Sequence, residues 1–580
     1  MRDISSPLDG FSSPFGPQRN RTLQSLLFGQ TEPGFTFEPW DITTLYQDRA
    51  GTTPVTAAGQ SVGLRLDKSK GLALGPELVT NGDFAAGATG WTDIVGAWAV
   101  TAGALVGTGI VANAYGPYSD NTSVVAGKFY RATFDVTVSS GSLLVRVGND
   151  QSSGYASSGT FTRIFQAVSS GVTVFQSRAG SAGFTGSIDN ISVRELAGNH
   201  EVAINDAKRG IYGWMPKTGR RNLLTYTEQF DNAVWSKSNA TVTANYDTDL
   251  DGSITADRFV SSGGSFPQIF QTLTLTAGQA YTFSAWVKSD GTSQIAQALL
   301  LEGVVTAFTP TSTWTRVSVS IASSAGGSRS VVVATNSPVA AASSFLIWGA
   351  QLEIGSTATA YQRVNSQYDV TEAGVPTCYY VQPDGVDDAY VTPTITPGTD
   401  KVQVFAGVRK LSNSTGIILE TGFNSGSFGA FYFATDTTPS NNFTYAGRGA
   451  RTGLVADAAN AASVAPASAV LTAQQDINSG NPSTIRKDGS LAVSSISTTF
   501  GGGNFLAYQA YIYGRGGTSL PFNGLDFGHA VRFGPNLDDA TIARVEALIA
   551  RNTPEVDFMF GGVWTDQYNW DDETNWNDGA

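Results

Sequence analysis

Cysteine and histidine are nearly absent from this chain, which has one cysteine and two histidines in 580 residues. A single cysteine excludes an internal disulfide, and two histidines are too few for most Cys/His metal clusters. Cys378 lies in the apolar stretch VPTCYY, so we expect a buried, unreactive thiol. His200 stands in a Gly-Asn-His junction, where we expect a structural role.

Charged residues are also scarce, at 14% of the chain, and acids outnumber bases to give a net charge of −13. Binding to a phosphate backbone needs concentrated Lys and Arg, so this charge argues against nucleic acid as a partner. No stretch reaches the roughly 18 uncharged apolar residues that a membrane span needs. Residues 1–7 also lack an apolar signal core. We therefore expect no membrane insertion.

Patterns that mark catalytic sites are missing as well. The chain has no Gly-X-Ser-X-Gly elbow, no phosphate-cradling glycine loop before a helix and no cluster of Cys and His. Glycosidases hold two carboxylates about 5–10 Å apart, and nothing in the sequence pairs the many acids. We therefore expect that the chain is not an enzyme.

Glycine and β-forming residues are abundant instead, with 65 glycines in the chain. Segments rich in Val, Thr, Tyr and Phe are separated by Gly, Asn, Asp and Ser, which is the pattern of all-β sandwiches. The exception is 538–551, DDATIARVEALIAR, where Ile542, Val545 and Ile549 fall on one helical face. The predicted class is all-β with one helix near the C-terminal end, and the length indicates several domains.

The N-terminal residues 1–30 contain a tandem of SSPLDGF and SSPFGP. Each proline favours extended backbone and precedes an apolar side chain, so this segment cannot build its own core. We expect an extended arm that docks on another protein through Leu8, Phe11 and Phe15. A disordered tail is the alternative.

The C-terminal residues 553–580 are acidic and rich in tryptophan. Trp564, Trp570 and Trp576 recur at intervals of six. An even interval places side chains on one face of an extended strand, so we expect a second docking arm. Disorder is again the alternative.

Residues 35–71, FTFEPWDITTLYQDRAGTTPVTAAGQSVGLRLDKSKG, carry a specific resemblance. Their PWD, TTLYQD, GTTPVT and DKS motifs resemble the leading segment of bacteriophage tail-fibre and virion proteins with a concanavalin- or laminin-G-like domain. In such proteins the chain runs on to a Gly-Asn-His and a short strand, which here begin at Gly198. The resemblance implies that this domain is split, and that Val62–Leu66 lies beside residues after 379.

Two stretches resemble jelly-roll carbohydrate-binding modules. Residues 76–197 open with NGDF and close with GSIDNISV, and residues 218–362 open with RRNLL and close with FLIWGAQLE. FYRATFDV at 129–136 and YTFSAWVK at 281–288 take the same place in the two stretches, which indicates an internal repeat. The concanavalin-like pattern resumes at YYVQPDGVDD, 379–388.

The expected fold is all-β and multidomain: two carbohydrate-binding-module-like jelly-roll sandwiches inserted in or preceding a concanavalin/laminin-G-like sandwich, with extended N- and C-terminal arms. The expected segments are an N-terminal virion-docking arm at 1–30, the leading part of the concanavalin-like domain at 31–75, a first module at 76–197, a connector at 198–217, a second module at 218–362, the concanavalin/laminin-G-like domain at 363–552 and an acidic Trp-rich arm at 553–580. We call the parts of the concanavalin-like domain together the host domain.

The resemblance implies a bacteriophage virion structural protein, a tail or head fibre, spike or adhesin subunit that binds host cell-surface glycans. It implies other virion proteins and host surface polysaccharide as partners, a homotrimer, and a place on the virion exterior after synthesis in the host cytoplasm. Two alternatives stay open. One is a purely architectural capsid or tail decoration protein, and the other is a polysaccharide depolymerase.

Site residues are expected in the first module. Sugar rings stack on exposed aromatic rings, and tyrosines in Gly/Ser-rich stretches are the candidates: Tyr115, Tyr118 and Tyr155. No cofactor is expected other than a structural Ca²⁺, which the resemblance to jelly-roll modules implies at Asp83 and Asp189 because carboxylates suit this cation.

A second calcium candidate lies at 247–258, DTDLDGSITADR, which copies the first positions of an EF-hand loop. Arg258 stands where that loop requires a bidentate Glu. We therefore expect a turn that leads into a strand, with a calcium loop as the alternative.

Overall fold

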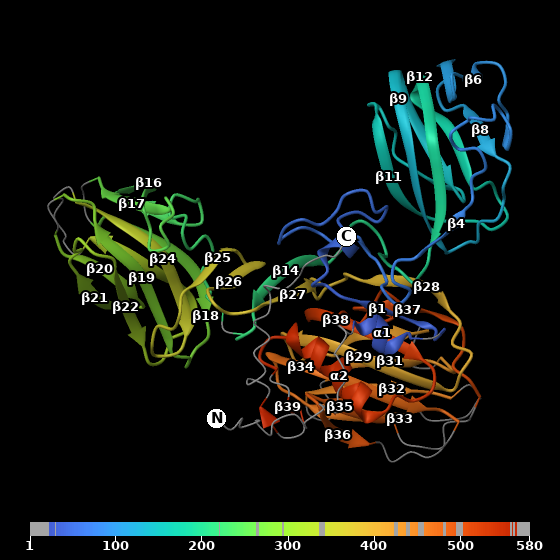
Figure 1. Cartoon of the computed structure of the whole chain (residues 1–580). Helices are drawn as coiled ribbons and strands as arrows, with labels where there is room; N and C mark the ends of the chain where they lie inside the picture. Colours follow the sequence, from blue (N-terminus) through green and yellow to red (C-terminus); the bar gives the residue numbers. More distant parts are fainter. Residues whose placement is uncertain are drawn as a thin grey trace, which may run out of the picture.

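The computed structural model contains three β-sheet bodies, the host domain and the two modules (Figure 1). It describes residues 22–29, 31–219, 221–262, 266–292, 295–335, 343–422, 427–436, 441–449, 457–478, 483–494, 503–556, 559–560 and 563–564. Strands dominate this described part of the chain, which confirms the predicted all-β, multidomain class.

The host domain is a sandwich of two large sheets. The ten-stranded sheet contains, in spatial order, β25 (Gln362–Ser366), β26 (Asp369–Glu372), β14 (Ile211–Pro216), β27 (Thr377–Gln382), β38 (Gly524–Phe533), β29 (Lys401–Lys410), β34 (Ala467–Asp476), β35 (Thr484–Lys487) and β36 (Ser490–Ser494), with β1 (Gly34–Phe37) also beside β38. The nine-stranded sheet contains β2 (Leu45–Tyr46), β3 (Leu64–Arg65), β13 (Glu201–Ala203), β28 (Tyr390–Ile395), β37 (Tyr508–Ile512), β30 (Gly416–Thr421), β31 (Phe431–Asp436), β32 (Asn442–Gly447) and β33 (Asp457–Ala462). Residues 198–217 supply one strand to each sheet, so they form part of the sandwich.

The core of the host domain lies between these sheets. β29, KVQVFAGVRK, is buried along most of its length because both of its faces are covered. Val404 belongs to the central core, while Phe405 packs with helix α2 (Asp539–Arg551). The predicted helix is therefore confirmed, and the Asp538 carboxylate caps it by accepting the N–H of Thr541 at 2.6 Å. The remaining short elements are α1 (Leu23–Leu27), η1 (Ile42–Thr44), β39 (Met559–Phe560) and β40 (Val563–Trp564).

Strand pairing shows how the host domain is split. β3 precedes the first module in sequence, yet it pairs with β13 beyond that module, and β13 pairs with β28. The backbone of β3 therefore lies in the same sheet as residues after 379, with β13 as the strand between β3 and β28. The expectation is met in part, because the side chains of Leu64 and Leu66 pack with Phe129 of the first module.

One buried carboxylate joins the two ends of this split. Asp67 accepts the backbone N–H groups of Thr36, Ser69 and Asn199 at 2.9, 2.8 and 2.7 Å. The N–H of Asp67 in turn donates to Nδ1 of buried His200 at 2.9 Å. Burial lowers the pKa of His200 to about 4, so the ring stays neutral and Nδ1 can accept. His200 therefore has the structural role expected for it.

Four buried charged side chains form a second link across the split. Arg65 pairs with Glu201 and lies 3.0 Å from the carboxylate of Asp526. His529 lies between the two acids, with Nδ1 2.8 Å from Asp526 Oδ2 and Nε2 2.8 Å from Glu201 Oε1. We call these four residues the charge cluster. Three rings lie within 5.4 Å of the Arg65 guanidinium, those of Phe37, Tyr390 and Tyr513.

The first module forms the body beside the host domain that is drawn in cyan (Figure 1). Its strands are β10 (Asp150–Gln151), β9 (Phe129–Val147), β12 (Phe175–Leu196), β7 (Ala104–Ile110) and β6 (Trp98–Thr101) in spatial order, with β11 (Gly159–Gln166) beside β9, β4 (Leu74–Glu77) and β8 (Tyr115–Ser119) beside β12, and β5 (Trp91–Thr92) beside β8. Aromatic rings fill its core, among them Trp91, Trp98, Phe134 and Phe175.

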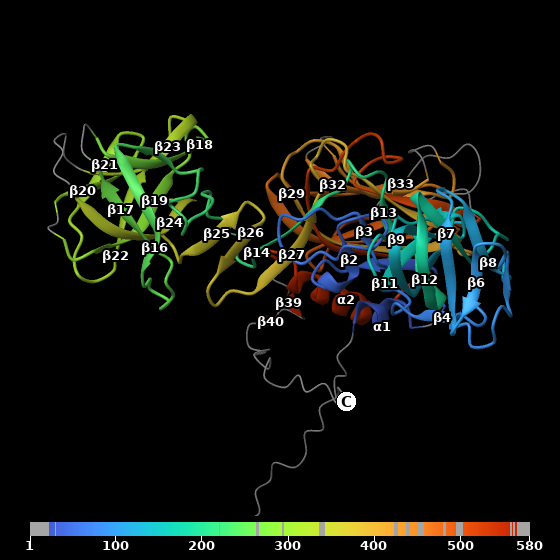
Figure 2. The same ribbon diagram turned by 90° about the horizontal axis from the view of Figure 1, so that it is seen from above.

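The second module has two five-stranded sheets. One contains β15 (Ser236–Ser238), β18 (Gln268–Leu275), β23 (Gly327–Thr335), β20 (Gln297–Leu301) and β21 (Val304–Phe308), and the other β16 (Ala240–Asp247), β17 (Ala256–Ser261), β24 (Ser344–Ile354), β19 (Tyr281–Ser289) and β22 (Thr315–Ile321). The predicted repeat has a structural counterpart, because FYRATFDV in β9 pairs with the closing strand β12 as YTFSAWVK in β19 pairs with β24. β25 and β26 form the edge of the ten-stranded sheet on the side toward this module (Figure 2).

Cys378 is buried in β27, as expected, and burial raises the pKa of its thiol to about 12, so the reactive thiolate form is disfavoured. Among the described residues, no helix is long and apolar enough to cross a membrane.

Candidate functional site

An aromatic groove lies on one face of the ten-stranded sheet, near its β25 edge. Trp214 of β14 stands opposite Tyr379 of β27 and beside Asp369 of β26, and Arg363 of β25 stands opposite Thr371 of β26. Directly opposed residues point to the same face of a sheet, so four strands contribute to one surface. The groove has a volume of about 410 Å³ and is lined by Trp40, Ile42, Tyr212, Trp214, Arg363, Thr371, Thr377 and Tyr379.

The aromatic rings of the groove form a floor and walls. Tyr212 is 1% exposed and forms the floor, whereas Trp214 and Tyr379 are half-buried. The Tyr212 and Tyr379 rings are nearly parallel, with 9° between their planes and 6.3 Å between their centroids. The Trp214 ring meets Tyr379 edge-on at 6.1 Å. Burial raises the pKa of Tyr212 far above its ordinary value, so its hydroxyl stays neutral.

Polar contacts fix the walls in place. The indole N–H of Trp214 donates to Asp369 Oδ1 at 2.8 Å, and the Arg363 guanidinium lies 3.6 Å from the same oxygen. Trp40 lies in the loop after β1, and its ring closely approaches Gly528 of β38 where it lines the groove. A Cβ at Gly528, whose φ is +127°, would lie only 2.7 Å from the Trp40 ring.

This lining matches what a saccharide requires. Small-molecule sites are concave, measure about 300–1,000 Å³ and combine apolar walls with a few polar groups. Aromatic rings offer apolar faces for the C–H side of a sugar ring, while Arg363 and the Thr371 and Thr377 hydroxyls can bond its hydroxyls. No described group in the groove resembles a nucleophile with an adjacent base.

The sequence carried only a partial signal for this groove. Tyr212 and Trp214 have the alternation of a strand, and Tyr379 lies in the apolar stretch VPTCYY, but their pairing depends on a register between residues more than 160 positions apart. Trp40 was recognised as part of the leading motif and not as a contact residue.

The predicted glycan tyrosines separate into two groups. Tyr115 and Tyr118 both lie on β8, a strand rather than a loop, and Tyr115 is 56% exposed. Tyr155 packs at 4.4 Å from the Phe161 ring and at 5.3 Å from Phe134. We therefore reassign Tyr155 from an exposed sugar contact to a packing residue of the first module.

The predicted docking residues of the two arms fall beyond the part that the structure describes. Leu8, Phe11, Phe15, Trp570 and Trp576 lie outside the described residues. Trp564 ends β40, but its side chain is not described. Their docking roles stay predictions.

The predicted calcium ligands Asp83 and Asp189 are not grouped with a third acid within the described residues. Asp83 accepts the N–H of Ala85 at 3.3 Å, and Asp189 accepts the N–H of Asn190 at 2.7 Å. In the EF-hand-like stretch, Asp249 accepts the N–H groups of Asp251 and Ser253, which is the turn that we expected.

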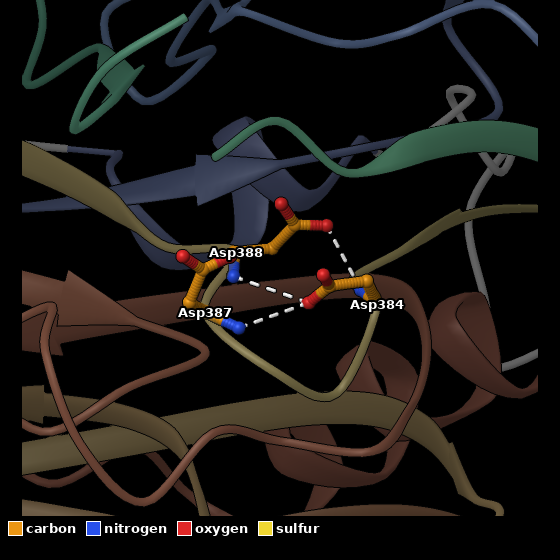
Figure 3. A group of neighbouring side chains, drawn as sticks. All are labelled: Asp384, Asp387 and Asp388. Carbon is orange, nitrogen blue, oxygen red and sulfur yellow. Dashed lines mark hydrogen bonds between the residues drawn. The ribbon is translucent and has the colours of Figure 1, made fainter. Parts of the chain in front are cut away.

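One group of three acids does occur in the described chain, at Asp384, Asp387 and Asp388 after β27 (Figure 3). Its carboxylate oxygens already accept hydrogen bonds within the turn: Asp384 Oδ1 accepts the N–H of Val386 at 2.8 Å, and Asp388 Oδ2 accepts the N–H of Asp384 at 2.8 Å. Lys208 lies 3.6 Å from Asp387. Burial and the neighbouring carboxylates raise the pKa of Asp388 to about 6.

Asp388→Asn is expected to raise the free energy of unfolding by about 1 kcal/mol at pH 7.5 in calcium-free buffer. Because the folded pKa of about 6 lies above the unfolded value of about 3.9, ionisation of Asp388 costs stability that grows as the pH rises between these values and is fully present at pH 7.5. The Asn oxygen can still accept the N–H of Asp384. Thermal unfolding with and without CaCl₂ measures the effect, and Asp387→Asn, at the exposed position beside Lys208, is the control. A calcium-dependent rise in Tm that Asp388→Asn abolishes would contradict this expectation, and a rise that persists in that variant would direct attention to Asp83 and Asp189.

Comparisons with known proteins do not assign the chain to a family. No family model matches the sequence, and no curated protein matches it. Among solved structures, the chain is similar to the Ruminococcus gnavus IT-sialidase CBM40, with 14% identity, a TM-score of 0.21, and coverage of 26% of this chain and 84% of the other. It is also similar to the N-terminal CBM22-1-CBM22-2 tandem domain from Paenibacillus barcinonensis Xyn10C, with 14% identity, a TM-score of 0.18, and coverage of 49% and 98%. At these TM-scores neither similarity supports an argument about ligand or mechanism.

Proposed function

We propose that this chain is a saccharide-binding protein, and that its aromatic groove is a binding site. The observation that carries the proposal is the set of aromatic residues, Trp40, Trp214 and Tyr379, gathered around one concave surface with polar groups at its rim. Trp214 and Tyr379 pack against the core of the host domain, but both are only half-buried, so part of each ring still faces the groove. A ligand with apolar ring faces and hydroxyl edges would fit these aromatic rings and the polar groups beside them.

The finer proposal is a bacteriophage virion adhesin that attaches to host surface polysaccharide. Its support is the resemblance of residues 35–71 to virion proteins and the apolar residues of the two terminal arms, which would dock on other virion proteins. A homotrimer on the virion exterior would present several grooves at once, and multivalency would strengthen weak single-site binding. A purely architectural role is the competing outcome of the test below.

Trp214→Ala and Tyr379→Ala are each expected to weaken saccharide binding about tenfold or more, because central aromatic contacts dominate binding energy. A glycan array with the full chain identifies a neutral oligosaccharide, and calorimetric titration then gives Kd for each variant. Tyr246→Ala, which removes a 49% exposed ring from β16 of the second module, is the matched control and should bind as the parent does.

Equal Kd values for parent, Trp214→Ala and Tyr379→Ala would exclude the groove as the site. Absence of any array signal from the full chain, together with retained association with virion particles, would favour the architectural role. Release of reducing ends from a bound polysaccharide would instead favour a depolymerase.

A further inference from the structure

A second surface with a different chemistry lies on the first module. Across β10, β9, β12 and β8, Gln151 stands opposite Arg146, Arg146 opposite Gln176, and Gln176 opposite Tyr118. One row away, Arg178 stands opposite Tyr115. The alternate residues on β9 and β12 are buried in the core, so this row of side chains faces outward. We call the set Tyr115, Tyr118, Arg146, Gln151, Gln176 and Arg178 the arginine face.

Both arginines of this face are held by neutral groups. Arg146 donates to Gln176 Oε1 at 2.9 Å and to Asn149 Oδ1 at 2.9 Å. Arg178 donates to Gln151 Oε1 at 2.8 Å and to the Asn113 carbonyl at 3.2 Å. Among the described residues, each guanidinium uses two of its five N–H donors, which leaves three for a ligand.

The positive charge of these arginines is not balanced by acids. Within the described part of the chain, neither Arg146 nor Arg178 has a carboxylate oxygen within ion-pair distance, although the chain as a whole carries a net charge of −13. Their guanidinium carbons lie 5.1 and 4.9 Å from the centroid of the Tyr115 ring. Tyr115 thus positions both cations while more than half of its own surface stays exposed.

We infer that the arginine face binds the carboxylate groups of an acidic saccharide. A planar guanidinium matches a carboxylate with two parallel N–H donors, and hydrogen bonds between charged partners are the strong ones. The amides of Gln151 and Gln176 lie between the cations, where they can bond sugar hydroxyls. Only the saccharide nature of the ligand rests on the proposed function; the charge preference rests on the arginines.

A long polyanion such as nucleic acid is a poorer occupant. Two arginines on a protein of net charge −13 cannot supply the many phosphate contacts on which such binding depends. A carboxylated sugar needs only one or two cations beside neutral hydrogen-bonding groups, and that is what this face offers.

The test compares tri-galacturonate with its methyl ester, which is the same sugar without the charge, on the full chain. The parent should bind the acid at least about tenfold more tightly than the ester at low salt, and added NaCl should reduce that preference. Arg146→Gln and Arg178→Gln should each reduce the preference severalfold, and the double variant should abolish it. Arg131→Gln, on the same strand β9 but outside the arginine face, makes the same charge change and should leave it unaltered.

Equal binding of acid and ester by the parent, no binding of the acid, or an equal loss in Arg131→Gln would overturn the inference.

Trp214→Ala separates the two sites. If neutral sugars lose affinity in that variant while the preference for the acid persists, both proposals stand. If the preference is lost with Trp214, the acid binds in the groove and the arginine face is refuted. If neutral sugars never bind but the preference depends on Arg146, the groove proposal alone fails.

Discussion

Arg65→Met is expected to lower the free energy of unfolding of the host domain by about 3–5 kcal/mol. The substitution leaves the carboxylates of Glu201 and Asp526 buried without the guanidinium that pairs with both. Their side chains are essentially inaccessible, so water cannot replace the lost partner. Met fills the space within the surrounding aromatic rings and keeps the effect of the lost charge apart from that of a cavity.

Differential scanning calorimetry checks this expectation, because the host domain and the modules can unfold in separate transitions. The matched control is Lys128→Met, which breaks an ion pair of 2.7 Å to Glu195 at the surface. That pair is 48% and 35% exposed, and its loss should change stability by less than about 1 kcal/mol. A host-domain transition in Arg65→Met within 1 kcal/mol of the parent would show that the charge cluster is not required.

The same cluster predicts a pH dependence. Burial opposes charge on His529, but the carboxylates of Asp526 and Glu201 outweigh burial and raise its pKa to about 9. Because the folded pKa lies above the unfolded value of about 6.5, this stabilisation is complete below pH 6.5 and is lost as the pH rises through 9. His200, with its pKa lowered to about 4, titrates below this window. His529→Gln should therefore lower stability at pH 6 and flatten the alkaline decline.

Asp67→Ala is expected to cost about 3 kcal/mol in the same domain. Three backbone N–H groups, those of Thr36, Ser69 and Asn199, would lose their acceptor at a position where Asp67 is fully buried, and each such loss costs about 1–3 kcal/mol. Part of this loss is offset, because burial raises the pKa of Asp67 and the ionised carboxylate is itself disfavoured there. The variant releases the two chain segments that enter and leave the first module.

Hydrogen exchange of these three amides, with calorimetry of the whole chain, measures the effect of Asp67→Ala. Asp67→Asn keeps one acceptor oxygen and should fall between the parent and Asp67→Ala. Asp83→Ala removes an exposed carboxylate with one weak hydrogen bond and should be nearly neutral. If Asp67→Ala matched Asp83→Ala, the junction at Asp67 would not be what holds the split domain together.

Sequence alone determined the parts of this protein that depend on neighbouring residues. Alternating apolar residues between turn-forming glycines and aspartates specify strands, and the spacing of Ile542, Val545 and Ile549 specifies the one long helix, because both patterns reflect local backbone geometry. The turn at Asp67 is interrupted, and its continuation begins at Gly198. The motifs before and after the interruption are each recognisable, so they identify the split host domain in the sequence.

Only the tertiary structure decided which side chains meet. The groove joins Trp40, Trp214, Arg363 and Tyr379 from segments as far as 339 positions apart, and the arginine face depends on the register of β12 between β9 and β8. A shift of one residue in either register would turn these side chains to the opposite face. Tyr155 also shows that local sequence does not specify a side chain's contacts, because its flanking residues are those of a loop while its ring packs on Phe134 and Phe161. Local sequence specifies a strand and its two faces, but pairing between distant strands specifies what each face binds.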